Sequence, residues 1–148
     1  MREVTRSALV AQPPSRMFAL INDIESYPAF VPGCTHARIE SRTPTQIVAT
    51  IGVRRGPMRA EITTRNTLES DRRIKMALVR GPFRELEGEW KLTPVGAGCR
   101  VELAMRFAFS NPMSAVVFEP LFEQTATSLV DAFVARARTL DTQRPPTT

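Results

Sequence analysis

The sequence predicts one α+β domain in which a curved antiparallel sheet wraps around a long C-terminal helix. Three observations predict this fold. Apolar and polar residues alternate along Val101–Phe109, as in a strand with one buried face. An amphipathic helical segment follows directly after Ser110, and several earlier segments repeat the strand alternation. Sheet and helix must bury their apolar faces, most simply against each other, and a sheet of this shape tends to enclose a cavity.

The first expected elements are a strand and two short helices. Val4–Val10 has the pattern of a strand, and the break at Gln12–Ser15 is followed by a helical pattern through Ile21. A second short helix is expected over Ile24–Phe30, where Pro28 interrupts it. Because helices this short are unstable alone, we expect them to lie across an opening of the sheet.

The middle of the chain predicts a run of further strands. Glycine, proline and polar residues mark the turns between them, and turns this short join antiparallel neighbours. In Glu85–Leu92, the clearest case, apolar residues alternate with charged ones, which assigns a dry face and a wet face. The expected strands are Ala37–Arg42, Gln46–Arg54, Met58–Glu69, Ile74–Arg80, Glu85–Leu92 and Val101–Phe109.

The C-terminal helix has a strong start, with Asn111 as the N-cap and Pro112 at the first helical position. Pro120 predicts a kink or a break, after which the helix should run to about Leu140. Arg136 continues the apolar stripe and must reach water, a carboxylate or a ligand; a structural role is the preferred interpretation. The stripe comprises Phe118, Phe122, Thr125, Ala126, Leu129, Phe133 and Ala137.

The composition is that of a single globular domain, which we expect over residues 1–140 with a disordered tail over 141–148. The first ten residues contain no signal peptide, and no apolar run is long enough to span a bilayer. Cys34 and Cys99 stand outside any cluster of metal-ligand type, so free thiols and no metal site are expected. These features predict a cytoplasmic protein.

The net charge is +5, and arginine carries the excess. Arg54, Arg55, Arg59 and Arg65 surround or follow a Gly-Pro turn, and if they share one end of the sheet they form a basic surface suited to phosphates. A merely solvated rim is the alternative. Aromatic residues do not interleave with the arginines, so sequence-specific nucleic-acid binding is not expected.

No catalytic constellation is visible, and we expect neither catalysis nor a cofactor. His36 is the single histidine and falls in a predicted loop beside Cys34, where an exposed loop histidine is preferred over a nucleophile–base pair. Asp23 and Glu25 are interpreted as helix caps. The chain contains no glycine-rich phosphate loop, HExxH or CxxC.

Bulky apolar residues are expected to converge between sheet and helix. They fit a solid core as well as a lined cavity, and solid core is the commoner outcome. Small residues at Gly88, Ala60, Ala49 and Ala126 favour a cavity. The converging residues are Trp90, Phe107, Phe109, Phe122, Leu129 and Phe133.

Several short motifs, taken together, match one known family. They are Ser7–Val10, Met17-Phe18, Asp23–Pro32, Gly81–Leu86 with Trp90, Phe109–Pro112, and Ala132-Phe133 with Arg136-Ala137. With these motifs the chain resembles the coenzyme Q-binding and ribosome-association-toxin branch of the START-like polyketide cyclase superfamily, from about Arg2 to Leu140. The resemblance implies a helix-grip (START/Bet v 1-like) fold around a hydrophobic cavity. One departure is Gly33, where many relatives carry a tryptophan.

The resemblance also implies a function and a site. The leading hypothesis is noncatalytic binding of a polyprenyl quinone, ubiquinone-like, or a similar lipid in support of respiratory electron transport. Competing hypotheses are a toxin-like regulator that binds the large ribosomal subunit and blocks subunit association and, more weakly, a polyketide cyclase or aromatase. By matching positions, Tyr27, Pro28 and Phe30 border the mouth, Phe83, Leu86 and Trp90 line the sheet wall, and Phe122, Leu129 and Phe133 form the helix wall.

A protein that exchanges a lipid is expected to contact a membrane transiently, which would place it at the periphery of the inner membrane. The best candidate for a lid that dips toward the bilayer is the apolar segment Tyr27–Val31.

Overall fold

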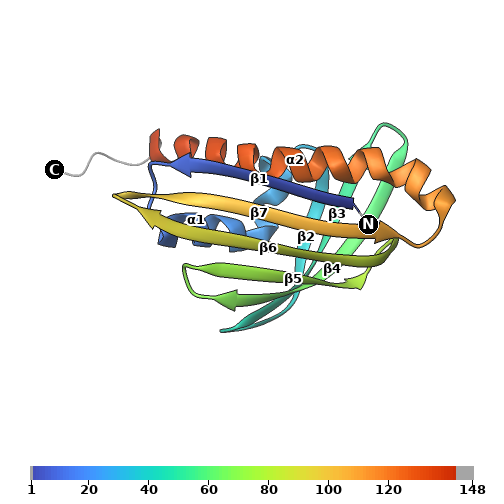
Figure 1. Ribbon diagram of the computed structural model, residues 1–148, viewed down its shortest axis with the longest axis horizontal. Coiled ribbons are helices and arrows are strands. Elements are labelled where there is room, and N and C mark those ends of the chain that lie inside the picture. The colour runs from blue at the N-terminus through green and yellow to red at the C-terminus, as the bar shows by residue number, and fades with distance from the viewer. Residues whose placement is uncertain (1, 143–148) are drawn as a thin grey trace.

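The structure is a computed structural model that describes residues 2–142 and confirms the predicted fold class (Figure 1). A seven-stranded antiparallel sheet has the strand order β1-β7-β6-β5-β4-β3-β2. Neighbours in sequence are neighbours in the sheet except for β1, which pairs with β7. The elements are β1 (Arg2–Val10), α1 (Pro14–Asn22), the 3-10 helix η1 (Ile24–Ala29), β2 (Cys34–Thr43), β3 (Gln46–Arg55), β4 (Met58–Glu69), β5 (Arg73–Arg80), β6 (Phe83–Val95), β7 (Gly98–Phe109) and α2 (Pro112–Thr142).

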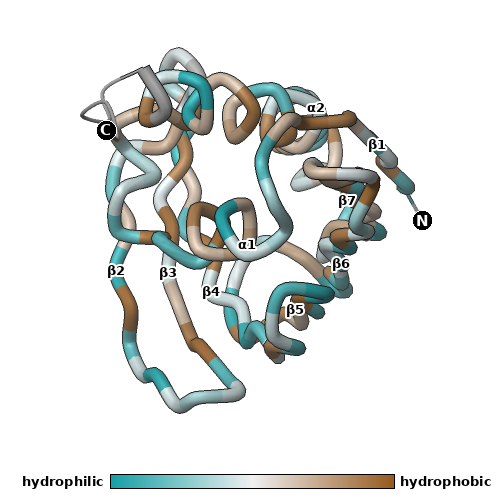
Figure 2. Tube along the Cα trace, turned by 90° about the vertical axis from the view of Figure 1, so that its left-hand side faces the viewer, coloured by the Kyte–Doolittle hydropathy of each residue, from teal (hydrophilic) through white to brown (hydrophobic). Residues whose placement is uncertain are grey.

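The sheet is strongly curved, and the helices cover its concave side. Seen from one end, the strands form a U whose arms are β1 and β2 (Figure 2). Helix α2 closes the open side of the U, while α1 lies inside the curve and contacts α2, β6 and β7. The apolar core therefore lies between the sheet and α2, as the alternation along the strands predicts.

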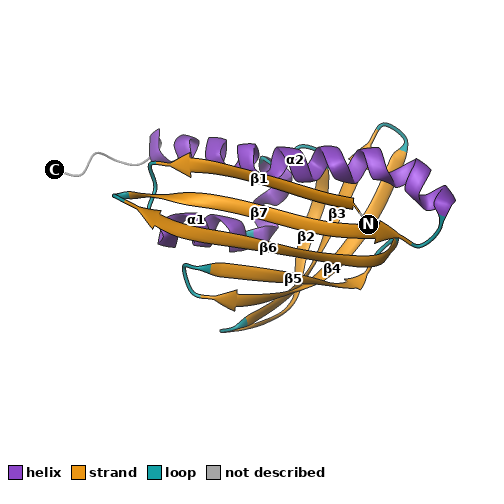
Figure 3. Ribbon diagram, viewed as in Figure 1, coloured by secondary structure: helices purple, strands orange, loops and turns teal. Residues whose placement is uncertain are grey.

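Helix α2 begins where the sequence predicts. The backbone N–H of Ser114 donates a hydrogen bond of 2.8 Å to Oδ1 of Asn111, which is N-cap geometry. The helix continues past Pro120, so the expected break does not occur. A kink remains compatible with the structure, and the N-terminal part of the helix bends in Figure 3. It ends at Thr142, two residues beyond the expected boundary, and residues 143–148 of the expected tail lie outside the described residues. Neither described helix is long and apolar enough to cross a membrane.

The core consists of two hydrophobic clusters. One surrounds Trp90 and Phe133, which are 3% and 0% exposed. The other surrounds Phe83 and Phe107 nearer the start of α2. Leu121 and Val130 of α2 are also buried although they lie outside the expected stripe, because the helix packs against β1, β7, β4 and α1 and needs a wider apolar face.

Candidate functional site

An enclosed apolar cavity of about 100 Å³ lies between the sheet, η1 and α2. Every strand from β3 to β7 contributes to its wall, and α2 and η1 close it. No charged residue lines it. The lining residues are Ile24, Tyr27, Val31, Cys34, Ala49, Ile51, Val53, Ile62, Thr64, Asn66, Met76, Leu86, Trp90, Met105, Thr125, Leu129 and Phe133.

Five of the residues assigned to the ligand site from the sequence line this cavity: Tyr27, Leu86, Trp90, Leu129 and Phe133. The ring of Phe133 makes edge contacts with Trp90 and Tyr27, at centroid distances of 5.3 and 5.2 Å. This aromatic trio joins the helix wall to the sheet wall and to η1.

Four other phenylalanines of the expected site do not line the cavity. Phe83 stacks on Phe109 at 4.9 Å and contacts Phe107 at 5.9 Å and Phe122 at 4.6 Å between ring centroids. These rings fill the space beside the cavity, so the structure places them in solid core rather than in the ligand wall.

The expected mouth residues have mixed positions. Pro28 is exposed and Phe30 is half-buried, and neither lines the cavity. Tyr27 and Val31 point inward, with exposures of 9% and 4%, so these two side chains cover the cavity instead of facing solvent. The segment acts as a closed cover.

A second depression, of about 200 Å³, lies next to the cavity at the surface. Thr125 lines both spaces, and Gly33 and Arg54 form the rim opposite α2. A Cβ at Gly33 would lie 3.1 Å from the Arg54 carbonyl oxygen, and the residue has a φ of +81°, so glycine is required there. Thr125 thus lies between the cavity and the surface depression.

Most polar groups of the lining are satisfied within the protein. The Tyr27 hydroxyl donates to the carbonyl of Ile21, and Thr125 Oγ1 donates to the carbonyl of Leu121 at 2.9 Å. Burial raises the pKa of Tyr27 far above its ordinary value, so the phenol stays neutral. Burial also raises the pKa of the Cys34 thiol, which donates to the carbonyl of His36 at 3.5 Å.

Sequence reasoning missed the polar and flexible part of the lining. Thr64 and Asn66 follow Ile62 at every second position on the inner face of β4, so the period-two pattern could have found them. Met76 and Met105 flank Gly88 on the neighbouring strands. A Cβ at Gly88 would lie 2.7 Å from Met76 Cε, so the missing side chain makes room for these thioethers.

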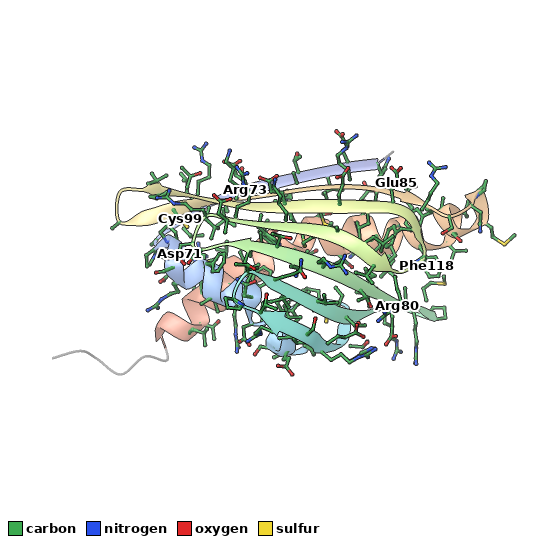
Figure 4. The ribbon with its side chains drawn as sticks, turned by 90° about the horizontal axis from the view of Figure 1, so that it is seen from below. Asp71, Arg73, Arg80, Glu85, Cys99 and Phe118 are labelled. Carbon is green, nitrogen blue, oxygen red and sulfur yellow. The ribbon has the colours of Figure 1, made fainter. Side chains whose placement is uncertain are left out.

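The basic residues are spread over the outer face. Arg54 and Arg59 are direct cross-strand partners beside the β3–β4 turn, whereas Arg65 lies farther along β4 opposite Val48. The side chain of Arg55 lies outside what the structure describes. Figure 4 shows Arg73 and Arg80 toward opposite ends of the sheet, so the arginine excess does not gather in one place.

His36 lies in strand β2 rather than in the predicted loop. Its Nε2 is 2.6 Å from Oε2 of Glu61, and this contact lowers the pKa of the Glu61 carboxyl. The ring lies over Gly52, where a Cβ would come within 2.1 Å of it. Both side chains are about half exposed on the convex face, away from the cavity. Cys34 and Cys99 are free thiols, and no group in residues 2–142 could hold a metal ion.

The fold and the enclosed cavity define a helix-grip protein with an internal apolar pocket. Residues 10–134 match the family described as polyketide cyclase/dehydrase and lipid transport, and the chain belongs to this family. A START superfamily protein from Mycobacterium smegmatis has a similar structure, with a TM-score of 0.78 at 19% identity over 93% of this chain and 98% of that one.

Two named proteins are similar to this chain in sequence. The ribosome association toxin RatA of Escherichia coli is 41% identical over 139 residues, covering 93% of this chain and 88% of the relative. The mitochondrial coenzyme Q-binding protein COQ10 of Saccharomyces cerevisiae is 28% identical, covering 92% of this chain and 70% of the relative.

Proposed function

We propose that this protein binds a neutral hydrophobic molecule of the polyprenyl quinone type, noncatalytically, in the cavity beneath η1. The observation that carries the proposal is an enclosed wall of aromatic and aliphatic side chains without a charged residue. Such a wall favours an uncharged apolar guest, because a buried charge without a partner is costly. The lipid-transport description of the family and the name of the COQ10 relative support the same ligand class.

The size of the cavity constrains how the ligand binds. At about 100 Å³ it is smaller than the roughly 300–1,000 Å³ typical of small-molecule pockets. We infer that it admits the head group while the tail leaves past Thr125 into the surface depression. Met76 and Met105 supply adaptable wall, since unbranched thioether side chains change rotamer at low cost.

The test compares two variants on the same helix. Leu129→Gln adds polar atoms to the wall, while Val116→Gln makes the same kind of change at a side chain that is 79% exposed. Native mass spectrometry after incubation with decylubiquinone measures loading. We expect Leu129→Gln to abolish loading and Val116→Gln to load like the wild type. Equal loading of both variants would exclude the cavity as the site.

Ribosomal subunit association is the second candidate, favoured by the name of the 41% identical relative. We propose that it would use the paired arginines Arg54 and Arg59, for which no ion pair is found among the described residues. Their phosphate contacts would weaken steeply with salt. Cosedimentation of the double variant Arg54→Glu/Arg59→Glu with large subunits tests this.

The matched control for charge is Lys91→Glu/Arg100→Glu, which reverses two exposed charges near the β6–β7 turn. We expect the first double variant to lose cosedimentation and the control to keep it. Equal binding by both would exclude the Arg54–Arg59 surface, and binding that persists at raised salt would exclude an electrostatic mechanism.

Ligand exchange would require a contact with the membrane surface, and the cytoplasmic side of the inner membrane is the place we propose. Met113 and Val116 at the start of α2 are 77% and 79% exposed, whereas Tyr27 and Val31 are buried. We therefore propose the α2 start rather than the Tyr27–Val31 cover as the contact. Met113→Ser/Val116→Ser should reduce sedimentation with anionic vesicles, and unchanged sedimentation would refute this contact.

A further inference from the structure

Asn66 is a polar side chain buried in an apolar wall. It lies on the inner face of β4, opposite Ile47 of β3 and Met76 of β5. Its exposure is 7%, and it borders the cavity. An amide in such surroundings needs hydrogen-bond partners, because burying an unpaired polar group costs free energy.

Only one end of this amide has a partner. Thr64 Oγ1 donates a hydrogen bond of 2.8 Å to Oδ1 of Asn66. Within residues 2–142, no acceptor is found for the amide nitrogen of Asn66. In the described part of the chain, only one polar side-chain atom is both fully enclosed and without a partner, and that atom is Asn22 Oδ1. Since the amide nitrogen of Asn66 also has no partner, it is not fully enclosed and must touch open space. The open space that Asn66 borders is the cavity.

Trp90, which lines the same cavity, carries a second unused donor. Its side chain is 3% exposed, and the described residues offer no acceptor to its indole N–H. The other donors of the lining are used: Tyr27 donates to Ile21, Thr125 to Leu121 and Cys34 to the carbonyl of His36. Asn66 and Trp90 of the lining therefore carry N–H groups without a partner, while the hydroxyl groups of the lining already donate.

We propose that the Asn66 amide donates a hydrogen bond to a carbonyl oxygen of the bound ligand, with Trp90 as a second donor. This inference rests on the proposed function and narrows the ligand to a neutral, carbonyl-bearing apolar molecule. A carbonyl oxygen only accepts, so it matches unused donors without bringing a hydrogen that needs its own partner. A carboxylate or phosphate would enter without a cation to pair with, because no charged residue lines the cavity.

Two probes separate recognition of the carbonyl from burial of the tail. Decylubiquinone carries two ring carbonyls on a ten-carbon chain, and decylbenzene carries the same chain on a ring without oxygen. Isothermal titration of both probes into wild type, Asn66→Leu and Trp90→Phe measures the affinities. Asn66→Leu replaces the amide by an apolar group of similar size, and Trp90→Phe removes the indole N–H but keeps a ring.

We expect Asn66→Leu to weaken decylubiquinone binding about three- to tenfold, as for the loss of one hydrogen bond. Decylbenzene should bind wild type and Asn66→Leu equally. Trp90→Phe should show the same selective loss, which keeps the test decisive if Asn66→Leu does not fold. The melting temperature of ligand-free Asn66→Leu should change little, because the variant removes an unpaired buried donor but also the acceptor of the Thr64 hydroxyl.

Two results would overturn the inference, and they differ from each other. In the first result, the wild type binds both probes, and the variants lose affinity for both equally or for neither. The two N–H groups then do not bind the carbonyl, and only this inference fails. If the wild type binds neither probe, the proposed function fails and takes the inference with it.

Discussion

The guanidinium of Arg136 on α2 lies over the ring of Phe30, 5.2 Å from the ring centroid. The same ring contacts Tyr27 and Phe133 edge-on, at 5.9 and 5.3 Å between centroids. A cation thus sits on the outer side of an aromatic group whose inner members line the cavity. This arrangement fastens the cover formed by η1 and the residues after it to α2.

The Arg136–Phe30 contact should contribute measurably to stability. A cation over an aromatic face contributes about 0.5–2 kcal/mol, depending on its exposure. In a double-mutant cycle with Arg136→Met and Phe30→Leu, urea unfolding should give a coupling energy in that range. If the losses of unfolding free energy in the two single variants simply add, the coupling energy is zero and Arg136 only covers apolar surface.

The position of Arg136 shows what periodicity predicts and what it does not. Helical spacing places Arg136 on the apolar stripe, and the structure gives it a structural contact with an aromatic ring, a partner that the sequence analysis did not name. The spacing could not identify the partner, because Phe30 belongs to a segment more than a hundred residues away in sequence, and only the folded sheet brings them together. Pro120 is similar: local chemistry allows a kink or a break, and the structure shows a helix that continues past it.

The strands were predictable because alternation alone assigns their inner faces. It does not tell how far along the sheet a cavity extends, and the family resemblance placed Phe83 and Trp90, both inward on β6, in one wall. In the structure Trp90 borders the cavity, while neighbouring aromatic rings fill the space around Phe83. Asn66 was missed because its amide interrupts the apolar residues of β4, although its even spacing from Ile62 places it on the inner face.

A pH dependence of stability follows from Glu40 on the convex face. Its carboxylate accepts hydrogen bonds from Arg80 at 2.8 and 2.9 Å and from Thr50 at 3.1 Å. The hydrogen bonds from Arg80 are the main cause that lowers the pKa of Glu40 in the folded protein. In the unfolded chain the pKa returns to about 4.3. The stabilisation is therefore present above that value and lost as the pH falls through the lowered folded-state pKa.

Urea unfolding measured between about pH 5 and pH 2 checks this sign. The free energy of unfolding of the wild type should fall with decreasing pH more steeply than that of Glu40→Gln. Glu85→Gln is the control, since it removes an exposed carboxylate for which the described residues provide no ion pair. Parallel profiles for wild type and Glu40→Gln would refute the contribution of the Arg80–Glu40 pair.

The two free thiols give a test of cavity occupancy. Cys34 lines the cavity, whereas Cys99 is buried elsewhere in the core. Because burial raises the pKa of both thiols, alkylation by N-ethylmaleimide should be slow at neutral pH and should accelerate as the pH rises. Decylubiquinone at ten times its Kd should slow labelling of Cys34 about tenfold and leave labelling of Cys99 unchanged.

Single-thiol variants, Cys99→Ala and Cys34→Ala, separate the two rates in mass spectrometry. Equal protection of both cysteines would mean that the ligand stabilises the whole fold against opening rather than occupying the cavity. No protection of Cys34 by a ligand that binds would place the ligand elsewhere.

Gly88 should control the size of the cavity. An alanine Cβ there would lie 2.7 Å from Met76 Cε, 3.4 Å from Met105 Cγ and 3.5 Å from the Ala104 carbonyl oxygen. The Met76 methyl is the flexible end of its side chain, so it should yield, and the space it can enter is the cavity that Met76 lines. Gly88→Ala should therefore weaken decylubiquinone binding. Its stability should change by less than about 1 kcal/mol, since alanine also relieves the entropic cost of a strand glycine.

The matched control is Gly52→Ala on the convex face. There a Cβ would come within 2.1 Å of the His36 ring, which is about half exposed and can swing into solvent without disturbing the cavity. Trp90 is the single tryptophan of the chain and lines the cavity, so quenching of its fluorescence by the quinone reports binding in both variants. Equal affinities for Gly88→Ala and Gly52→Ala would mean that the Met76 wall does not limit the guest. A selective loss in Gly88→Ala would establish that a missing side chain on β6 makes room for the ligand.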